Sequence, residues 1–262
     1  MAEIATTSEG GNNLPVDALP ACVSDETARI EVRAVAEAGL YSDAGGRRYF
    51  ATDLSFWNAK GLTGQQRQMH LVAVPVGEPN RWGLIPAWII QLGDQNPRLY
   101  QAEQLSKGNA VFAPDKASPE CAVSLRRAEA AARRAESGEW GTEGDVRIFS
   151  GAAPASFQGN AGRYVIARGR IVSLGKTRST RYLNFGRHWK SDLTVTLKSS
   201  EEAAFNEGMG ADGWQIEDLQ GLFVEVRGVL QEKDGPLIAL RHPEQLRVLE
   251  RKRAGSGGQN SN

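Results

Sequence analysis

The segment from residue 161 to residue 190 concentrates side chains that could bind a polyanion. It contains eight Lys or Arg residues and one His, but no Asp or Glu. Four aromatic residues, Tyr164, Tyr182, Phe185 and Trp189, lie among these cations. Cations bind phosphates and aromatic rings stack on bases, so this pattern predicts a surface for single-stranded nucleic acid. The candidate nucleic-acid-binding residues are Arg170, Lys176, Arg178, Arg181, Tyr182, Arg187, Trp189 and Lys190.

Two other interpretations of these cations remain open. The whole chain has 31 Lys+Arg and 31 Asp+Glu, so its net charge gives no preference for a polyanion. The cations could form a solvated surface that packs against the acidic stretch 201–218, or they could dock onto an acidic protein partner. Strand alternation also divides the aromatic residues, because Tyr182 would face one side of a strand and Phe185 the other.

Short strand-like runs must position these side chains. Strand patterns occur at 163–175, 180–186, 192–198, 219–231 and 236–241. A helix fits residues 200–208, and a turn at 232–235 joins the last two strands. Five strands with one helix between the third and the fourth is the order of an OB fold, so we expect an OB-type barrel here.

The preceding segment has strands first and helices afterwards. Alternating residues around the turn at 43–46 predict a β-hairpin, and residues 70–76 and 84–92 fit further strands. A short helix fits 99–107, ended by Gly108, and a longer helix fits 118–137. The chain is therefore expected to be mainly β with a few helices, an α+β protein.

Three motifs in this segment resemble the thermonuclease (staphylococcal-nuclease-like) family. They are NRWGLIPAWI, LYQAEQLSKGNAVFAP and CAVSLRRAEAAARRAESGEWG, in the order and spacing of that family. The resemblance covers Ile30 to Trp140 and implies an OB barrel with C-terminal helices. The blocks at 182–186 and 193–196 are similar to OB domains that follow nuclease-like modules in some bacterial proteins. Together these resemblances imply two OB-fold-type β-barrels in tandem, the first of staphylococcal-nuclease type.

The resemblance does not extend to the catalytic residues of the family. These hold Ca²⁺ with aspartates, activate water with a glutamate and stabilise phosphate charge with arginines. In the register set by the turn at 46–48, the corresponding positions carry no charge: Gly39, Phe50, Ser55, Asn58 and Leu84. A register shifted by two residues recovers Arg48 and Asp53 but places Phe56 at the glutamate. We therefore expect neither a metal site nor a cofactor.

Other residues near the vacated cleft have two interpretations each. His70, Asp53 and Arg81 could form a different catalytic site. Alternatively, His70 is a structural or surface histidine, and Asp53 and Arg81 are solvated loop charges. Phe56 and Trp57 stand where a polar active site would be, and they predict an apolar cleft suited to protein contact.

The two cysteines, Cys22 and Cys121, are too few for a disulfide scaffold and lack the spacing of a zinc site. The residues alone favour two thiols. Exported relatives of the thermonuclease family often carry a cysteine at the position of Cys121, so the resemblance implies a disulfide with Cys22 and an oxidising compartment. The sequence has no transmembrane run and no signal-peptide pattern, which predicts a soluble protein. It would be cytoplasmic as it stands, or periplasmic if an export signal has been removed.

Composition sets the expected boundaries. Ends rich in Gly, Ser and Asn predict disordered tails at 1–28 and 251–262, and a weakly patterned stretch predicts a linker at 143–160 between domains at 29–142 and 161–250. The expected function is that of a non-catalytic nuclease-like protein, which binds single-stranded nucleic acid or serves as an assembly subunit for an acidic partner. The alternative is a divergent phosphodiesterase that depends on calcium or another metal.

Overall fold

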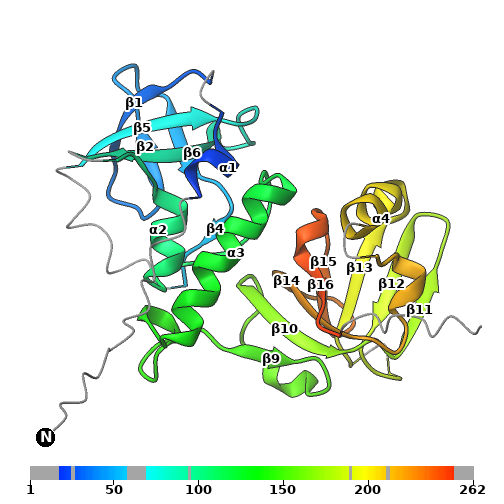
Figure 1. Cartoon of the computed structure of the whole chain (residues 1–262). Coiled ribbons are helices and arrows are strands. Elements are labelled where there is room, and N and C mark those ends of the chain that lie inside the picture. Colours follow the sequence, from blue (N-terminus) through cyan, green and yellow to red (C-terminus); the bar gives the residue numbers. More distant parts are fainter. Residues whose placement is uncertain are drawn as a thin grey trace, which may run out of the picture.

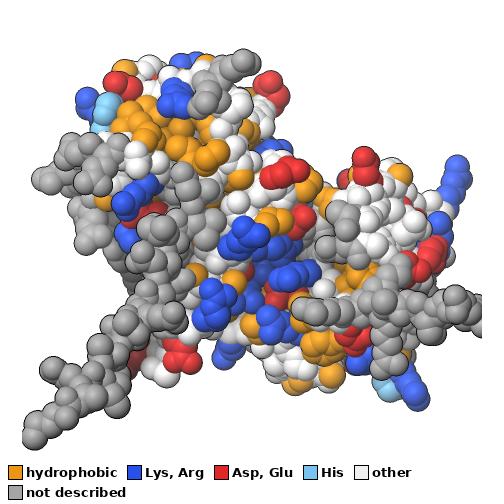
Figure 2. Space-filling model, viewed as in Figure 1, with side chains coloured by type: hydrophobic (Ala, Val, Ile, Leu, Met, Phe, Trp, Pro, Cys, Tyr) orange, Lys and Arg blue, Asp and Glu red, His pale blue; other side chains and the backbone are white. Residues whose placement is uncertain are grey.

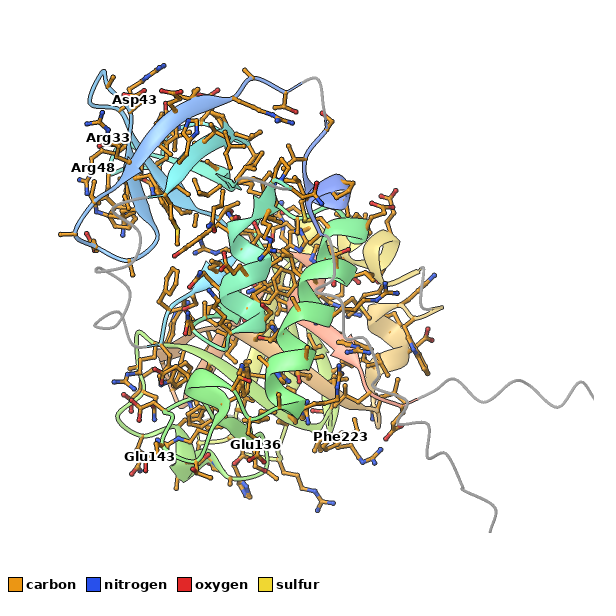
Figure 3. The ribbon with its side chains drawn as sticks, turned by 60° about the vertical axis from the view of Figure 1, so that its left-hand side comes forward. Arg33, Asp43, Arg48, Glu136, Glu143 and Phe223 are labelled. Carbon is orange, nitrogen blue, oxygen red and sulfur yellow. A yellow bond between two sulfur atoms is a disulfide. The ribbon has the colours of Figure 1, made fainter. Side chains whose placement is uncertain are left out.

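The computed structural model describes residues 18–24, 27–57, 69–93, 96–188, 191–210 and 213–250. The described chain is mainly β and forms two halves, with helix α3 (Pro119–Arg134) between them (Figure 1). In Figure 3, Glu136 and Phe223 mark the end where α3 stops beside β14 (Phe223–Glu232), whereas Arg33 and Arg48 lie at the free end of the first half.

The first half, residues 18–140, is built on a five-stranded path of pairings. Its strands are β1 (Ile30–Ala34), β2 (Leu40–Ser42), β3 (Arg48–Ala51), β4 (Leu54–Ser55), β5 (His70–Pro75), β6 (Leu84–Leu92), β7 (Arg98–Leu99) and β8 (Val111–Phe112). Antiparallel pairs join β1 to β2, β2 to β3, β5 to β6 and β1 to β5, and a parallel pair joins β3 to β6. The path of pairings therefore returns to β1, around a core that includes Tyr41, Tyr49 and Ile89.

Two further helices lie in this half. Helix α2 (Tyr100–Ser106) matches the short predicted helix, and Gly108 follows it with φ of +72°. A Cβ at this glycine would lie 2.0 Å from the carbonyl oxygen of Ser137, so the position requires glycine twice over. Ser118 caps the start of α3, because its side chain accepts a hydrogen bond from the Cys121 N–H, and the helix ends at Arg134, earlier than predicted.

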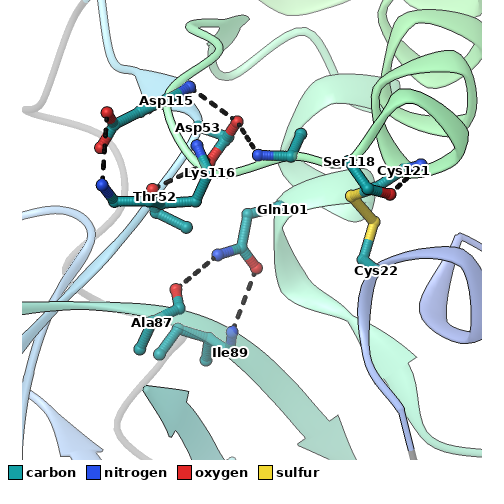
Figure 4. The surroundings of a disulfide bond; sticks show 11 residues. Cys22, Thr52, Asp53, Ala87, Ile89, Gln101, Asp115, Lys116, Ser118 and Cys121 are labelled. Carbon is teal, nitrogen blue, oxygen red and sulfur yellow. Dashed lines mark hydrogen bonds and ion pairs between the residues drawn. A yellow bond between two sulfur atoms is a disulfide. The ribbon is translucent and has the colours of Figure 1, made fainter. Parts of the chain in front are cut away.

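The N-terminal segment is ordered further out than expected. Helix α1 (Leu19–Cys22) lies within the predicted disordered tail 1–28, but Ala18 and Val23 are buried in the core against α3. A disulfide joins Cys22 to Cys121, with their Cα atoms 4.7 Å apart (Figure 4). The predicted tail at 251–262 and residues 1–17 lie outside the described residues.

The second half, residues 148–250, closes into a five-stranded barrel. Its strands are β9 (Ile148–Ser150), β10 (Tyr164–Arg170), β11 (Ser173–Lys176), β12 (Thr180–Asn184), β13 (Thr194–Lys198), β14, β15 (Pro236–Ala239) and β16 (Leu246–Val248). The pairing order is β11-β12-β13-β15-β14-β10. Only two residues separate β10 from β11, so these two count as one strand and the path closes with five. Helix α4 (Glu202–Gly210) lies between β13 and β14, where the sequence predicts a helix.

The segment 143–160 differs from the expected linker. Strand β9 pairs in parallel with β10, and a 3-10 turn follows at Pro154–Phe157. The rings of Phe149 and Phe157 stack 5.1 Å apart within the core of the second half. This segment is part of that half, because its two aromatic side chains supply buried apolar surface that a solvated linker would not.

Candidate interaction site

At Gly39, which the thermonuclease resemblance aligned with an aspartate, the ring of Phe56 occupies the space that a side chain would need. Gly39 has φ of +73°, and a Cβ built on it would lie 2.6 Å from the ring of Phe56. Phe56 packs against both core clusters of the first half. A carboxylate at position 39 would displace this ring, so the aspartate of the family has no room here.

Three of the other positions to which the thermonuclease resemblance pointed, Phe50, Ser55 and Leu84, belong to strands. Phe50 lies in β3 and Leu84 lies in β6, where Leu84 pairs with Arg48. Ser55 lies in β4 and pairs with Val111 of β8. Asn58 lies outside the described residues. Within the described ranges, no group of three or more His, Cys, Asp and Glu side chains could hold a metal ion.

Asp53 is a structural carboxylate, and its interpretation as a solvated loop charge is wrong. It is 3% exposed, with φ of 62°. Its oxygens accept hydrogen bonds from the backbone N–H groups of Asp115, Lys116 and Ala117 at 2.9 to 3.0 Å, and from the Thr52 hydroxyl at 2.8 Å (Figure 4). Burial raises the pKa of Asp53, and these four hydrogen bonds oppose the rise. The carboxylate thus ties the turn after β3 to the loop before α3.

The structure does not bring His70 and Arg81 together with Asp53. His70 begins β5 and lies 3.3 Å from Glu31, with both side chains exposed. Arg81 lies in the turn at the other end of the β5–β6 hairpin, with its guanidinium 4.0 Å from the ring centre of Trp82.

Trp57 contacts the second half of the same chain. Its neighbour Phe56 packs into the first half, whereas Trp57 packs against the core of the second half. Of the two predicted interaction residues, Trp57 therefore contacts the other half of the same chain, whereas Phe56 lies within the first half.

A cluster of charged side chains, most of them buried, also joins the two halves. We call Glu129, Arg133, Arg168, Glu225 and Arg227 the interface ion cluster. Arg227 is 2% exposed and donates to the Phe112 carbonyl at 2.8 Å, to Glu129 at 3.2 and 3.3 Å, and to Glu225. Arg133 bridges Glu129 at 2.9 Å and Glu225 at 3.2 Å, and Arg168 reaches Glu225 at 2.7 Å.

Charge pairing shifts the pKa values of Glu225 and Arg227 in this cluster. Burial alone would raise the pKa of Glu225, but the guanidinium groups of Arg227 and Arg133 lower it well below its usual range. Burial alone would lower the pKa of Arg227, and the carboxylates of Glu129 and Glu225 raise it instead. The ion pairs of the cluster join α3 to β14, and β14 to β10, and so connect the two halves.

Most of the described cations in the basic segment are paired with carboxylates. Arg181 is 4% exposed and pairs with Glu202 at 3.3 Å and with Glu217. Lys176 also pairs with Glu202, at 3.3 Å, and Arg170 pairs with Glu250 at 3.0 Å. This arrangement is the predicted packing against the acidic stretch 201–218 for Lys176 and Arg181. Arg181 faces inward because it alternates in phase with the buried Leu183.

A smaller set of the predicted nucleic-acid residues remains available. Arg178 and Arg187 are exposed at opposite ends of β12, and neither forms an ion pair with another described residue. Tyr182 is half-buried between them, opposite Gly175 and Thr196. Trp189 and Lys190 lie outside the described residues.

A groove of about 380 Å³ lies beside the interface ion cluster, between α3 and the second half. We call it the α3 groove. Its apolar wall includes Val123, Met209, Trp214, Leu246 and Val248, and its charged lining is Arg126, Arg127, Glu244 and Arg247. Figure 2 shows Lys and Arg side chains gathered between the two halves, where α3 lies in Figure 1.

Its charges are not balanced within the described chain. Arg126 pairs with Glu244 at 2.8 Å, which uses the acid that lines the groove. Arg127 and Arg247 are exposed, and neither forms an ion pair with another described residue. Val123, one helical turn before Arg127, is 47% exposed. The groove therefore combines an apolar wall with uncompensated positive charge.

Sequence reasoning missed the groove and the interface ion cluster. Glu225 and Arg227 alternate with Val224 and Val226 along β14, and this spacing of two places both charges on one strand face. That pattern is a signal for a buried ion pair. The groove has no such local signal, because its walls come from α3, α4 and β16, together with residues such as Trp214 and Pro243 outside these elements.

No protein-family model matches the chain, and a search of curated proteins finds no match. Among solved structures, the chain is similar to the OBody AM1L10 bound to hen egg-white lysozyme, with a TM-score of 0.27 and 18% sequence identity. The alignment covers 37% of this chain and 89% of that chain. Of the helices in the described ranges, none has the length and apolar character to cross a membrane.

Proposed function

We propose that the chain is a non-catalytic, nuclease-like protein that acts as an assembly or interaction subunit. Its two halves would be OB-type barrels in tandem, since strand pairings in each follow the same order from the first strand back to itself. The observation that carries the proposal is the packing of Phe56 onto Gly39, with Trp57 on the second half. Phe56 and Trp57, which stand where the family would have its active site, are thereby used for packing within the molecule.

A cleavage assay tests the non-catalytic part of this proposal. Labelled single-stranded DNA and RNA would be incubated with excess protein and Ca²⁺, Mg²⁺ or Mn²⁺, with chelator as the control. We expect intact substrate throughout, because losing one catalytic group typically costs a factor of about 10² to 10⁴. Metal-dependent cleavage that co-purifies with the protein would instead support the alternative, a divergent phosphodiesterase.

Capture of a partner from the native source tests the assembly part. The full chain, fixed to its neighbours by a short cross-linker, should retain a defined protein at constant stoichiometry. A chain that remains free under these conditions, and binds no nucleic acid, would contradict the proposal.

Binding of single-stranded nucleic acid is the second candidate function. Arg178, Arg187 and Tyr182 support it, because they combine exposed cations with an aromatic ring on one barrel. Replacing Arg178 and Arg187 by alanine should reduce the slope of log affinity against log salt by about one per lost phosphate contact. Arg33→Ala in the first half is the matched control, and an equal loss with it would argue against this surface.

An exported setting is also part of the proposal. Disulfides persist in oxidising compartments, and the bond between Cys22 and Cys121 supports a periplasmic or other oxidising location over the cytoplasm. Thiol labelling of the protein in cells would test this, since a protein labelled at both cysteines without reductant would contradict it.

A further inference from the structure

The α3 groove has the chemistry of a binding site for a protein segment. It offers Val123, Met209 and Leu246 as apolar contacts, and it leaves Arg127 and Arg247 without an ion pair in the described chain. Apolar anchors surrounded by cations match a segment that carries apolar side chains between carboxylates.

The shape of α3 favours a chain segment over a small molecule. Val123, Arg127, Ala130 and Arg134 are spaced by four, three and four residues, so they share one face of the helix. With a rise of about 1.5 Å per residue, this row is about 16 Å long, the span of about five extended residues. Arg127 in the middle and the exposed Arg134 at the end extend the positive charge along it.

The groove is also fixed in advance. Arg126 and Glu244 pair across it, and the ion pairs Arg133–Glu225 and Arg227–Glu129 hold α3 against β14. A binding site whose walls do not need to be ordered on association loses less conformational entropy.

We infer that the α3 groove binds an acidic protein segment that contributes apolar side chains, and that Arg127 and Arg247 select its charge. This inference rests on the proposed interaction function and names the surface and the partner chemistry for it. The exposed cations of the second-half barrel, Arg178 and Arg187, are a separate surface.

A peptide-binding experiment tests it. The probe is a short fluorescein-labelled peptide in which glutamates surround one phenylalanine and one leucine, measured by fluorescence anisotropy with the full chain. Two comparison peptides replace the apolar residues by serine or the glutamates by lysine. We expect the acidic apolar peptide to bind, and each comparison peptide to bind at least roughly tenfold more weakly.

Matched variants locate the site. The double variant Arg127→Glu/Arg247→Glu should weaken peptide binding at least roughly tenfold, whereas Arg178→Glu/Arg187→Glu makes the same charge change elsewhere and should not. Near-UV circular dichroism checks folding, and Arg127→Gln/Arg247→Gln provides a milder change if the first variant misfolds. Equal affinities for the two double variants, or loss only with the second, would overturn the inference.

Other occupants give different results. A single-stranded oligonucleotide that displaces the peptide and loses affinity with Arg127→Glu would make the groove a nucleic-acid site. Concentration-dependent dimerisation lost with Arg127→Glu would make it a contact between copies, and tighter peptide binding after deletion of residues 1–17 would make this chain its own occupant. Each of these outcomes would overturn the inference. A partner captured equally well by wild type and by Arg127→Glu/Arg247→Glu would refute the groove while leaving the interaction function intact.

Discussion

Helix α3 carries arginines in two contrasting settings. On the side of the interface ion cluster, Arg133 is paired with Glu129 and Glu225 and contributes to a contact between the halves. On the side of the α3 groove, Arg127 is exposed and pairs with no described residue. One helix therefore supplies both a contact between the halves and an exposed charged surface. The two arginines differ because a charge stabilises the fold only where a carboxylate of the same chain lies beside it.

The largest expected effect on stability comes from removing Arg227 from the interface ion cluster. Arg227→Met leaves Glu129 and Glu225 buried without their main cation, and should lower the free energy of unfolding by about 3 to 5 kcal/mol. Urea unfolding followed by circular dichroism measures this loss. Arg168→Met is the control, because Arg168 also pairs with Glu225 but is 38% exposed, and it should cost no more than about 1 kcal/mol. Equal small losses for the two variants would mean that the cluster does not hold the halves.

The disulfide at the start of α3 should have the next largest effect. Cys22→Ala/Cys121→Ala removes a link across 99 residues of sequence, and should lower stability by about 2 to 4 kcal/mol. The variant should still bind the acidic peptide, since neither cysteine lines the groove. Denaturation with and without reductant provides the control: wild type should respond to reductant, and the variant should not. Lost peptide binding in a folded variant would show that the groove depends on this link.

Acid should weaken the contact that the interface ion cluster makes between the halves. The pKa of Glu225 is lower in the folded chain than in the unfolded chain, so its contribution is present above the unfolded pKa and is lost as the pH falls toward the folded value. Stability should therefore decrease below about pH 4, by on the order of 2 kcal/mol from this carboxylate. Thermal melts from pH 7 to pH 3 measure the trend, with Glu225→Gln expected to flatten it. An unchanged slope in that variant would assign the acid sensitivity elsewhere.

The groove arginines should have the smallest effect on stability. Arg127→Ala and Arg247→Ala should each change the free energy of unfolding by less than about 0.5 kcal/mol, because exposed side chains without a partner stabilise little. The same variants should weaken binding of the acidic peptide. Thermal unfolding and fluorescence anisotropy together separate the effect on stability from the effect on binding. A large loss of stability in Arg127→Ala would instead assign Arg127 to the contact between the halves.

Local patterns predicted the secondary structure of both halves well. The alternation at 180–186 and the turn at 232–235 appear as β12 and as the connection between β14 and β15, and Gly108 ends α2 as expected. The prediction of a linker was wrong because composition alone does not show that Phe149 and Phe157, in a stretch rich in Gly and Ala, are core side chains. Arg181 is buried because it alternates in phase with Leu183, so strand alternation predicts its burial better than its charge does.

The sequence by itself determined the mainly β architecture, the positions of α2, α3 and α4, and the absence of charge at Gly39, Phe50, Ser55 and Leu84. These features depend on neighbouring residues or on residue identity, which a linear pattern records. Only the tertiary structure decided which cations are paired with carboxylates of the same chain. Glu129 meets Arg227 across 98 residues, and Arg126 meets Glu244 across 118. Such pairing depends on how the halves pack, because the charge of an arginine is available to a partner only where folding has not already neutralised it.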